Sequence, residues 1–317
     1  MLTADVTAIG EVLIDYTPYG VSEGGQPLFE QNPGGAPANV LAALSHLKKR
    51  TAFIGKVGND MQGHFLVQTL REHGIDTSGI VIDDHVFTTL AFVSLKDGER
   101  SFSFARKPGA DTCLRPEEVR AGLLQKTRFL HFGSLSLTDE PARSATMHAI
   151  NIAKQSGAWI SYDPNYRAPL WESEQTAVSR MRSVLPYVDI MKLSDEETSL
   201  LTGESDPRVA AEVLLNQGIS CVIVTLGAEG AYLATKHVQV TEPGFQSHVI
   251  DTTGAGDSFW GGVLSKLCDF ETAPAALTIQ QAHSLLRFAN AVASCCVEKR
   301  GGIPAMPTLT EVQARLH

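Results

Sequence analysis

The stretch Asp251-Thr252-Thr253-Gly254-Ala255-Gly256-Asp257 determines much of what can be inferred about this chain. A Gly-Ala-Gly turn lies between two carboxylates, and an apolar run follows it at once. Because Trp260, Leu264 and Leu267 share one face at helical spacing, we predict that the turn forms the N-terminus of a helix. Free backbone N–H groups at such an end bind anions, and glycines let a phosphate approach closely.

Asp257 has two interpretations at this point. A carboxylate inside an anion site is unfavourable unless it has a chemical task, and accepting a proton from an attacking hydroxyl is such a task. This interpretation predicts a phosphoryl-transfer site with Asp257 as the base. The alternative is a plain turn in which Asp257 caps a helix, a position that Asp favours.

Composition sets the outer limits. The chain has 317 residues, is 43% hydrophobic and carries a net charge of −9. This size allows one large domain with a substantial core, and the acidic balance argues against nucleic-acid binding. The opening residues lack a basic signal-peptide start, and no apolar run is long enough to span a membrane. We expect a cytoplasmic protein without a membrane partner.

Cysteine usage fits this compartment. Five cysteines without CxxC spacing are expected to be reduced thiols, mostly buried: Cys113, Cys221, Cys268, Cys295 and Cys296. The ten histidines show no spacing typical of metal ligands.

Strand and helix patterns alternate from about residue 127 onward, which predicts a mostly parallel α/β sheet covered by helices on both faces. Earlier in the chain, two segments are strand-like without helices, at about 12–35 and 87–107. Asp97-Gly98 separates two strand patterns in the second segment, a strong hairpin signal. We expect these segments to form a small sheet, or lid, on a single domain spanning residues 1–317.

Several ordered motifs together resemble the ribokinase-like carbohydrate kinases, also called the PfkB family, and most closely its bacterial fructokinases. The resemblance covers nearly the whole chain. The motifs are Gly10-Glu11 to Asp15, Gly34-Gly35-x-x-x-Asn39, Gly55 to Asp60, Asp163-Pro164-Asn165, Thr225 to Gly230, and Asp251 to Asp257.

The resemblance implies a role for each matching residue near the reacting groups. Asp257 would be the catalytic base, and the N–H groups of Gly254, Ala255 and Gly256 would form the anion hole. Sugar contacts are implied for Asp15, Gly34, Gly35 and Asn39. For Asp15 the alternative is a turn carboxylate at a strand end, and for Asn39 a polar residue in a first helical turn.

Further contacts are expected later in the chain and on the hairpin. Asp163, Asn165 and Arg167 follow a predicted strand, at the sheet edge where α/β proteins bind ligands. Arg167 would meet a phosphate or a polar sugar group, or it is a surface charge. Phe104 and Arg106, on the second strand of the predicted hairpin, are expected to face the sugar. There Arg106 would recognise a carboxylate, or it too lies on the surface.

The nucleotide is expected over Lys192, Thr225, Gly227 and Gly230, although the last two also fit a simple strand-to-hairpin turn. Asn290 resembles an adenine-side contact, with a capped polar group in the core as the alternative.

ATP and Mg²⁺ are the implied cofactors. Glu197 would hold Mg²⁺ through water, although Ser194 stands where many members of the family have Asn. Ser194 is also a good N-cap for the helix that follows. Asp251 and Thr253 match positions that help bind a monovalent cation, so activation by K⁺ is expected.

The function expected is an ATP-dependent sugar kinase, with D-fructose phosphorylated on its 6-hydroxyl. Alternatives with the same chemistry are 2-keto-3-deoxygluconate kinase, ribokinase and a nucleoside or aminoimidazole riboside kinase. A Rossmann dehydrogenase lacks support because the third glycine of its fingerprint is absent, and a P-loop enzyme because no GxxxxGK[ST] string occurs. A non-catalytic sugar-binding protein would not need Asp257 in an anion hole.

We also expect a homodimer paired through the lid, because its strands have an exposed edge.

Overall fold

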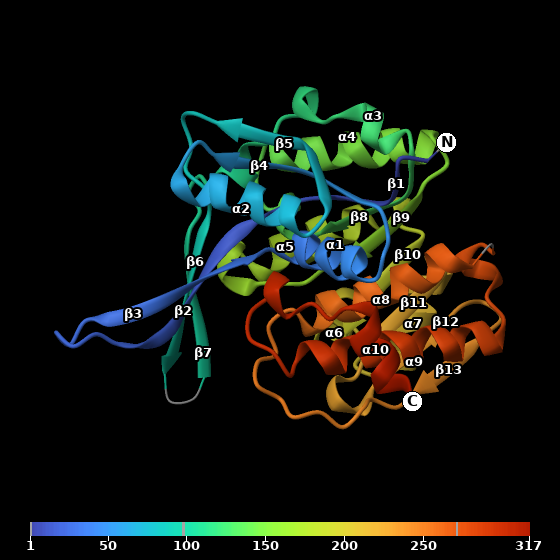
Figure 1. Ribbon diagram of the computed structural model, residues 1–317. Helices are drawn as coiled ribbons and strands as arrows, with labels where there is room; N and C mark the ends of the chain where they lie inside the picture. Colours follow the sequence, from blue (N-terminus) through green and yellow to red (C-terminus); the bar gives the residue numbers. More distant parts are fainter. Residues whose placement is uncertain (1, 97–98, 271) are drawn as a thin grey trace.

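The computed structural model describes residues 2–96, 99–270 and 272–317, so the Asp97-Gly98 turn lies outside the described residues. Its larger sheet has nine strands in the order β13-β12-β11-β10-β9-β8-β1-β4-β5 (Figure 1). The strands from β11 to β5 in that order are parallel, while β12 and β13 are antiparallel additions at one edge. The nine strands are β1 (Ala4–Ile9), β4 (Thr51–Gly58), β5 (Ile75–Asp83), β8 (Thr127–Gly133), β9 (Trp159–Asp163), β10 (Ile190–Ser194), β11 (Cys221–Thr225), β12 (Ala231–Ala234) and β13 (Gln239–Glu242).

Helices cover both faces of this sheet. Along β11, Cys221 and Ile223 join one buried cluster, whereas Val222 and Val224 join the other. Alternate side chains of a strand point to opposite faces, and here both faces are dry, which explains the continuous apolar runs. One cluster contains α1 (Ala36–His46), α2 (Met61–Glu72), α8 (Ala255–Asp269) and α9 (Ile279–Cys296). The other contains α3 (Ala121–Leu124), α4 (Ala142–Gln155), α5 (Glu174–Ser183), α6 (Asp195–Thr202) and α7 (Pro207–Asn216), while α10 (Leu309–Leu316) packs on α9.

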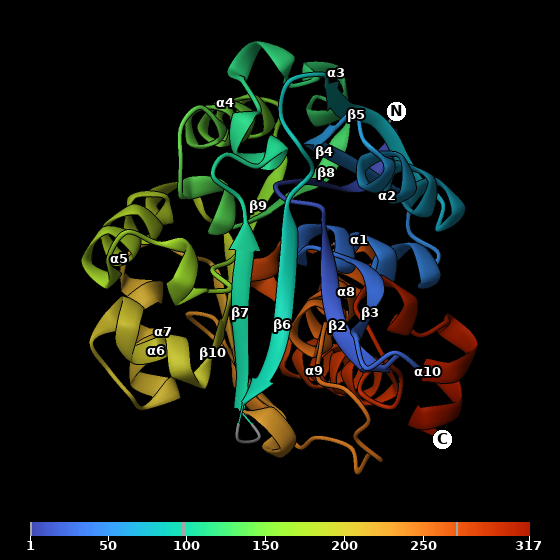
Figure 2. The same ribbon diagram turned by 90° about the vertical axis from the view of Figure 1, so that its left-hand side faces the viewer.

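A second sheet of four strands forms the predicted lid, in the order β3-β2-β6-β7. Figure 2 shows these strands side by side in front of the body, and Figure 1 shows the β2–β3 hairpin standing away from it. The strands are β2 (Leu13–Val21), β3 (Pro27–Gly34), β6 (Leu90–Lys96) and β7 (Glu99–Ala105). Strand β6 begins three residues later than the pattern from Phe87 predicts.

The predicted helix after Gly254 is confirmed as α8, which begins at Ala255. Ser194 caps α6 as expected, because its hydroxyl accepts the N–H of Glu197 at 3.3 Å. Within the described residues, no helix is long and apolar enough to cross a membrane. All five cysteines are free thiols.

Candidate functional site

The loop before α8 forms one wall of a cavity of about 760 Å³ between the two sheets. Gly254 precedes the helix with a φ of 76°, the left-handed region that glycine adopts without strain. A Cβ on Gly254 would lie 3.0 Å from the side chain of Met306, so a larger residue would crowd the turn. No side chain caps this helix end, and Gly254, Ala255 and Gly256 all line the cavity. The Ala255 N–H donates to the Thr252 carbonyl at 3.2 Å, so an anion here would meet the helix end through the other N–H groups of the turn.

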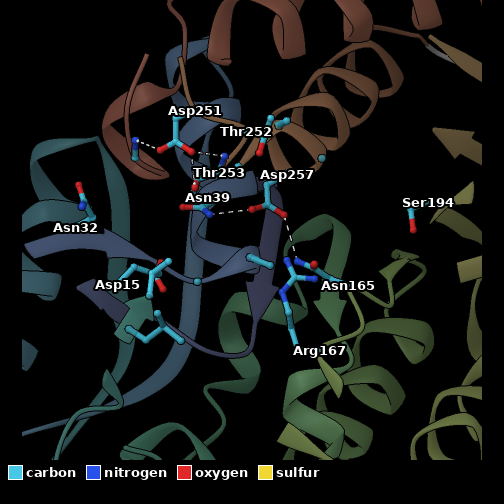
Figure 3. A pocket seen from close by; sticks show the side chains of 18 of the residues that line it. Asp15, Asn32, Asn39, Asn165, Arg167, Ser194, Asp251, Thr252, Thr253 and Asp257 are labelled. Carbon is cyan, nitrogen blue, oxygen red and sulfur yellow. Dashed lines mark hydrogen bonds between the residues drawn. The ribbon is translucent and has the colours of Figure 1, made fainter. Parts of the chain in front are cut away.

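Asp257 lies in the first turn of α8 and is only 8% exposed. Its carboxylate accepts hydrogen bonds from the amide groups of Asn39 at 2.8 Å and Asn165 at 3.4 Å (Figure 3). Burial raises the pKa of Asp257 to about 6, although the bond from Asn39 opposes the rise. A carboxylate with this pKa is largely ionised at neutral pH yet basic enough to take a proton from a hydroxyl.

Asp163 has a different place from the one expected. It does not line the cavity; its carboxylate binds the Lys192 ammonium at 2.8 Å beneath the floor. Burial by itself would lower the pKa of Lys192, but the carboxylates of Asp163 and Glu197 outweigh it and raise that pKa. Lys192 lines the cavity, and its Nζ would lie 3.3 Å from a Cβ built on Gly256. A fixed positive charge therefore stands beside the anion-binding turn.

The opposite wall comes from the lid and α1. Asp15, Gly35, Asn39 and Phe104 line the cavity, as expected. Burial raises the pKa of Asp15 to about 7, and the Arg167 guanidinium opposes the rise.

Two other residues expected to contact the sugar, Gly34 and Arg167, have positions that suggest additional or different roles. Gly34 does not line the cavity, but a Cβ there would lie 2.4 Å from the Asp15 carboxylate, so the glycine makes room for that group. Arg167 is exposed, as in the surface interpretation, and it also lines the cavity, where its charge acts on Asp15 and Asp257.

The expectation that Arg106 faces the sugar is wrong. Its side chain is 3% exposed and pairs with Asp111 at 2.7 Å, away from the cavity lining. The arginine lies just beyond β7, where the chain enters the body, so its guanidinium is used to join lid and body.

Only some of the residues expected to contact the nucleotide line the cavity. Thr225 at the end of β11 and Gly227 line the cavity, but Gly230 and Asn290 do not. The Asn290 amide donates to the carbonyls of Glu242 at 3.1 Å and Pro243 at 3.0 Å, so it is the capped core group that was the alternative.

Glu197 lines the cavity and is engaged by the backbone. One oxygen accepts the N–H of Tyr166 at 2.7 Å, and the other that of Ser194 at 2.9 Å. Each carboxylate oxygen has a second lone pair, so a water of hydrated Mg²⁺ fits here. Among the described residues, no group of three or more His, Cys, Asp or Glu could hold a metal ion.

Asp251 joins the anion-binding loop to the segment after α9. Its carboxylate accepts the N–H and the hydroxyl of Thr253 at 3.0 and 2.8 Å, and the N–H of Gly301 at 3.0 Å. Both loops are thus held together around the place where the resemblance puts a monovalent cation.

Three more residues belong to the cavity: Asn165 was expected near the sugar, whereas Asn32 and Glu11 had no expected role. Asn165 contacts Asp257, Asn32 lines the lid side, and Glu11 is buried with one oxygen accepting the Ala36 N–H at 2.9 Å. Burial raises the pKa of Glu11 to about 7. Glu11 and Asn165 follow strands β1 and β9, and that position was the available signal, whereas Asn32 lies within β3.

The chain is similar to known proteins along nearly its whole length. The protein named Probable fructokinase-4 of Arabidopsis thaliana is 42% identical over 98% of this chain and 96% of its own length. The crystal structure of a fructokinase with bound ATP from Xylella fastidiosa matches with a TM-score of 0.90 at 34% identity, over 99% of this chain and 98% of that one. A Vibrio cholerae fructokinase double mutant, in a fructose, ADP and potassium ion bound form, matches with a TM-score of 0.90 at 33% identity, over 100% and 99% of the two chains.

These likenesses confirm the resemblance and the fold expected from the sequence. Residues 3–309 match the family described as pfkB family carbohydrate kinase, so the chain belongs to this family and is a phosphotransferase that acts on a sugar hydroxyl.

Proposed function

We propose that the protein transfers the γ-phosphoryl group of ATP to the 6-hydroxyl of D-fructose. The observation that carries the proposal is the buried Asp257 carboxylate, held by two amide groups at the anion-binding end of α8. The choice of fructose is supported by the similarity to fructokinases over the whole chain.

The reaction follows from where these groups stand. The sugar hydroxyl would donate its proton to Asp257 as its oxygen attacks the γ-phosphorus. Backbone N–H groups of Gly254, Ala255 and Gly256 would stabilise the charge on the transferring group, and Lys192 adds a fixed positive charge beside them. Asp15 and Asn39 would hold the sugar. Bound Mg²⁺ would neutralise the phosphates, with Glu197 holding it through water.

Among the alternatives, 2-keto-3-deoxygluconate kinase loses its support. Its case rested on Arg106 recognising a carboxylate, and that guanidinium is already paired with Asp111. Ribokinase and aminoimidazole riboside kinase remain as outcomes of the test, whereas membership of the kinase family leaves the non-catalytic binding protein without support.

The test is an assay of ADP release with fructose, ribose, 2-keto-3-deoxygluconate and aminoimidazole riboside, with the product identified by ³¹P NMR. We expect the highest kcat/KM with fructose and a 6-phosphate product. A higher kcat/KM with another sugar would assign that sugar instead, and no sugar-dependent ADP release would exclude a kinase.

We also propose activation by K⁺, since Asp251 and Thr253 hold the two loops where it would bind. Replacing K⁺ by tetramethylammonium at constant ionic strength should lower kcat. Equal rates in both salts would contradict this proposal.

Dimerisation through the lid and a cytoplasmic location complete the proposal. Large apolar side chains lie exposed on β2, β3 and β6, namely Tyr19, Val21, Leu28, Phe29 and Phe92. Such a patch is typical of an interface. Light scattering at micromolar concentration should give twice the chain mass, and a monomer would contradict it.

The five free thiols agree with a reducing compartment.

A further inference from the structure

The lid is tied to the body by one buried carboxylate. Thr89 lies directly before β6, and Arg106 lies directly after β7. Asp111 accepts the Thr89 hydroxyl with one oxygen and Arg106 Nε, at 2.8 Å, with the other. The side chains of Arg106 and Asp111 are 3% and 2% exposed. We call Thr89, Arg106 and Asp111 the Asp111 clamp.

The clamp is itself attached to the body. Arg106 donates to the Thr138 hydroxyl and to the Leu135 carbonyl, both at 2.9 Å, and Leu135 lines the cavity. A Cβ on Gly109 would lie 1.8 Å from the Thr89 hydroxyl oxygen, so only glycine permits this contact. The buried groups are mutually satisfied, and such networks are rigid.

A second carboxylate holds the neighbouring residue. Asp60, the N-cap of α2, accepts the N–H and the hydroxyl of Thr88 at 2.7 and 2.8 Å. The Thr88 hydroxyl oxygen also accepts the N–H of Gly58 at 3.0 Å. The Gly55 to Asp60 motif, to which the catalytic chemistry assigns no role, thus holds the strand that enters the lid.

Strand register relates the clamp to the sugar side of the cavity. One row crosses all four lid strands: Asn32, Asp15, Ala91 and Phe104. Asn32, Asp15 and Phe104 line the cavity. The Leu90–Ala105 pair alone separates this row from Thr89 and Arg106. Any displacement at the clamp would therefore move the row directly.

We propose that the Asp111 clamp, supported by Asp60, keeps the base of the lid fixed and thereby positions the row from Asn32 to Phe104 over the sugar. Lid movement would then occur in the strands beyond this row. Thr89, Arg106 and Asp111 are positioning residues in this scheme. The inference rests on the proposed sugar kinase function, because small displacements of binding groups slow a reaction strongly and a loose lid admits water.

The test uses Thr89→Val, which removes the hydroxyl and keeps the shape. Changing Asp111 would leave the Arg106 charge buried and unpaired, which threatens folding. We expect the KM for the sugar to rise roughly fivefold, as for one lost hydrogen bond, with little change in the KM for ATP. The share of ATP hydrolysed without sugar phosphate should also rise.

Two matched variants separate positioning from stability. Thr89→Ser keeps the hydroxyl and should restore both quantities. Thr146→Val removes a buried hydroxyl of α4, which donates to Ala142 at 2.9 Å away from the cavity lining, and should change Tm without changing either quantity. Unchanged KM and coupling in Thr89→Val would overturn the inference. The inference would also be overturned if Thr146→Val changed the sugar KM and the coupling as much as Thr89→Val does.

Hydrogen exchange of the unaltered protein gives a second test if Thr89→Val does not fold. Amides of Thr88, Thr89 and Arg106 should be protected equally with and without sugar, and a sugar-dependent change there would place the moving hinge at the clamp and overturn the inference. The unaltered enzyme also tests the function separately. If it prefers another sugar, fructose is the wrong substrate, and the same variants are assayed with the preferred one.

Discussion

The nine-stranded sheet and the lid sheet are buried in different ways. Phe53 in β4 is 0% exposed, with packed side chains on its face, whereas Phe29 in β3 is 46% exposed. On β2, every second residue points to the same face, and three of these residues line the cavity: Leu13, Asp15 and Thr17. From this difference in burial we expect the main sheet to carry most of the stability and the lid to contribute mainly to sugar recognition.

The site lies where the two sheets meet. Asp257 comes from a helix packed on the main sheet, and Asp15 comes from the lid. Chemistry and sugar selection are thus separable, and the predictions below test this separation in order of decreasing effect.

The largest effect is expected for Asp257→Ala. Removing the general base should lower kcat by about 10²–10⁴-fold, while circular dichroism stays unchanged. The control is Asp5→Ala. Asp5 lies near the start of β1 and pairs with Arg50, outside the cavity lining, so this variant should keep its kcat. Near-normal turnover of Asp257→Ala would refute the base assignment.

Core truncation should distinguish the two sheets next. Phe53→Ala should lower the free energy of unfolding by about 3–5 kcal/mol, because a fully buried ring leaves a cavity. Phe29→Ala on the lid should change it by less than about 0.5 kcal/mol. Urea denaturation at one low protein concentration measures both. Similar losses would contradict the division between the sheets.

The pH profile tests both carboxylates at once. Asp15 and Asp257 have pKa values raised to about 7 and about 6; Asp257 must be ionised to take a proton, and Asp15 accepts a sugar hydroxyl most strongly when ionised. Activity is therefore lost as the pH falls. The logarithm of kcat/KM should fall with a slope near one below pH 7, and near two below pH 6. The residual activity of Asp15→Asn should show a single slope of one, with its onset near pH 6. A flat profile down to pH 5 would contradict both assignments.

The smallest effect is expected for Ser194→Asn, on the rim of the main sheet. Asn caps helices as well as Ser does, so Tm should hold, and its amide adds a group near the proposed Mg²⁺ position. We expect the Mg²⁺ concentration for half-maximal rate to fall by about two- to threefold, because the entropy cost of holding the bridging water offsets most of the gain from one added contact. An increase would show that Ser194 itself favours the ion.

Local signals predicted most of the main sheet. Helix α8 and the cap at Ser194 were predicted because glycine turns, caps and helical spacing act over a few residues. The β11–β12 hairpin matches the alternative reading of Gly227 and Gly230 as a strand-to-hairpin turn, but β13 and the parallel strand β5 were not predicted. Strands β12 and β13 have only four residues each, and β5 contains Asp and Gly, which are uncommon in strands.

Side-chain roles were predicted less well than elements. Arg106 has the charge and strand position of a ligand contact, but Asp111 reaches it once the chain turns at Gly109. Asn290 interrupts an apolar helix as a binding residue would, yet its side-chain amide donates to two backbone carbonyls at the end of β13. Asp163 was expected at the sugar, and Asn165 contacts Asp257 instead.

The sequence by itself determined the α/β class, the lid and the anion-binding turn with its carboxylate, because these depend on local backbone preference and on the periodicity of apolar residues. Only the tertiary structure decided which polar groups remain for a ligand. Each buried charge or amide must find a partner, and that partner is supplied by segments far apart in the chain, as Lys192 is to Asp163 and Asn39 to Asp257.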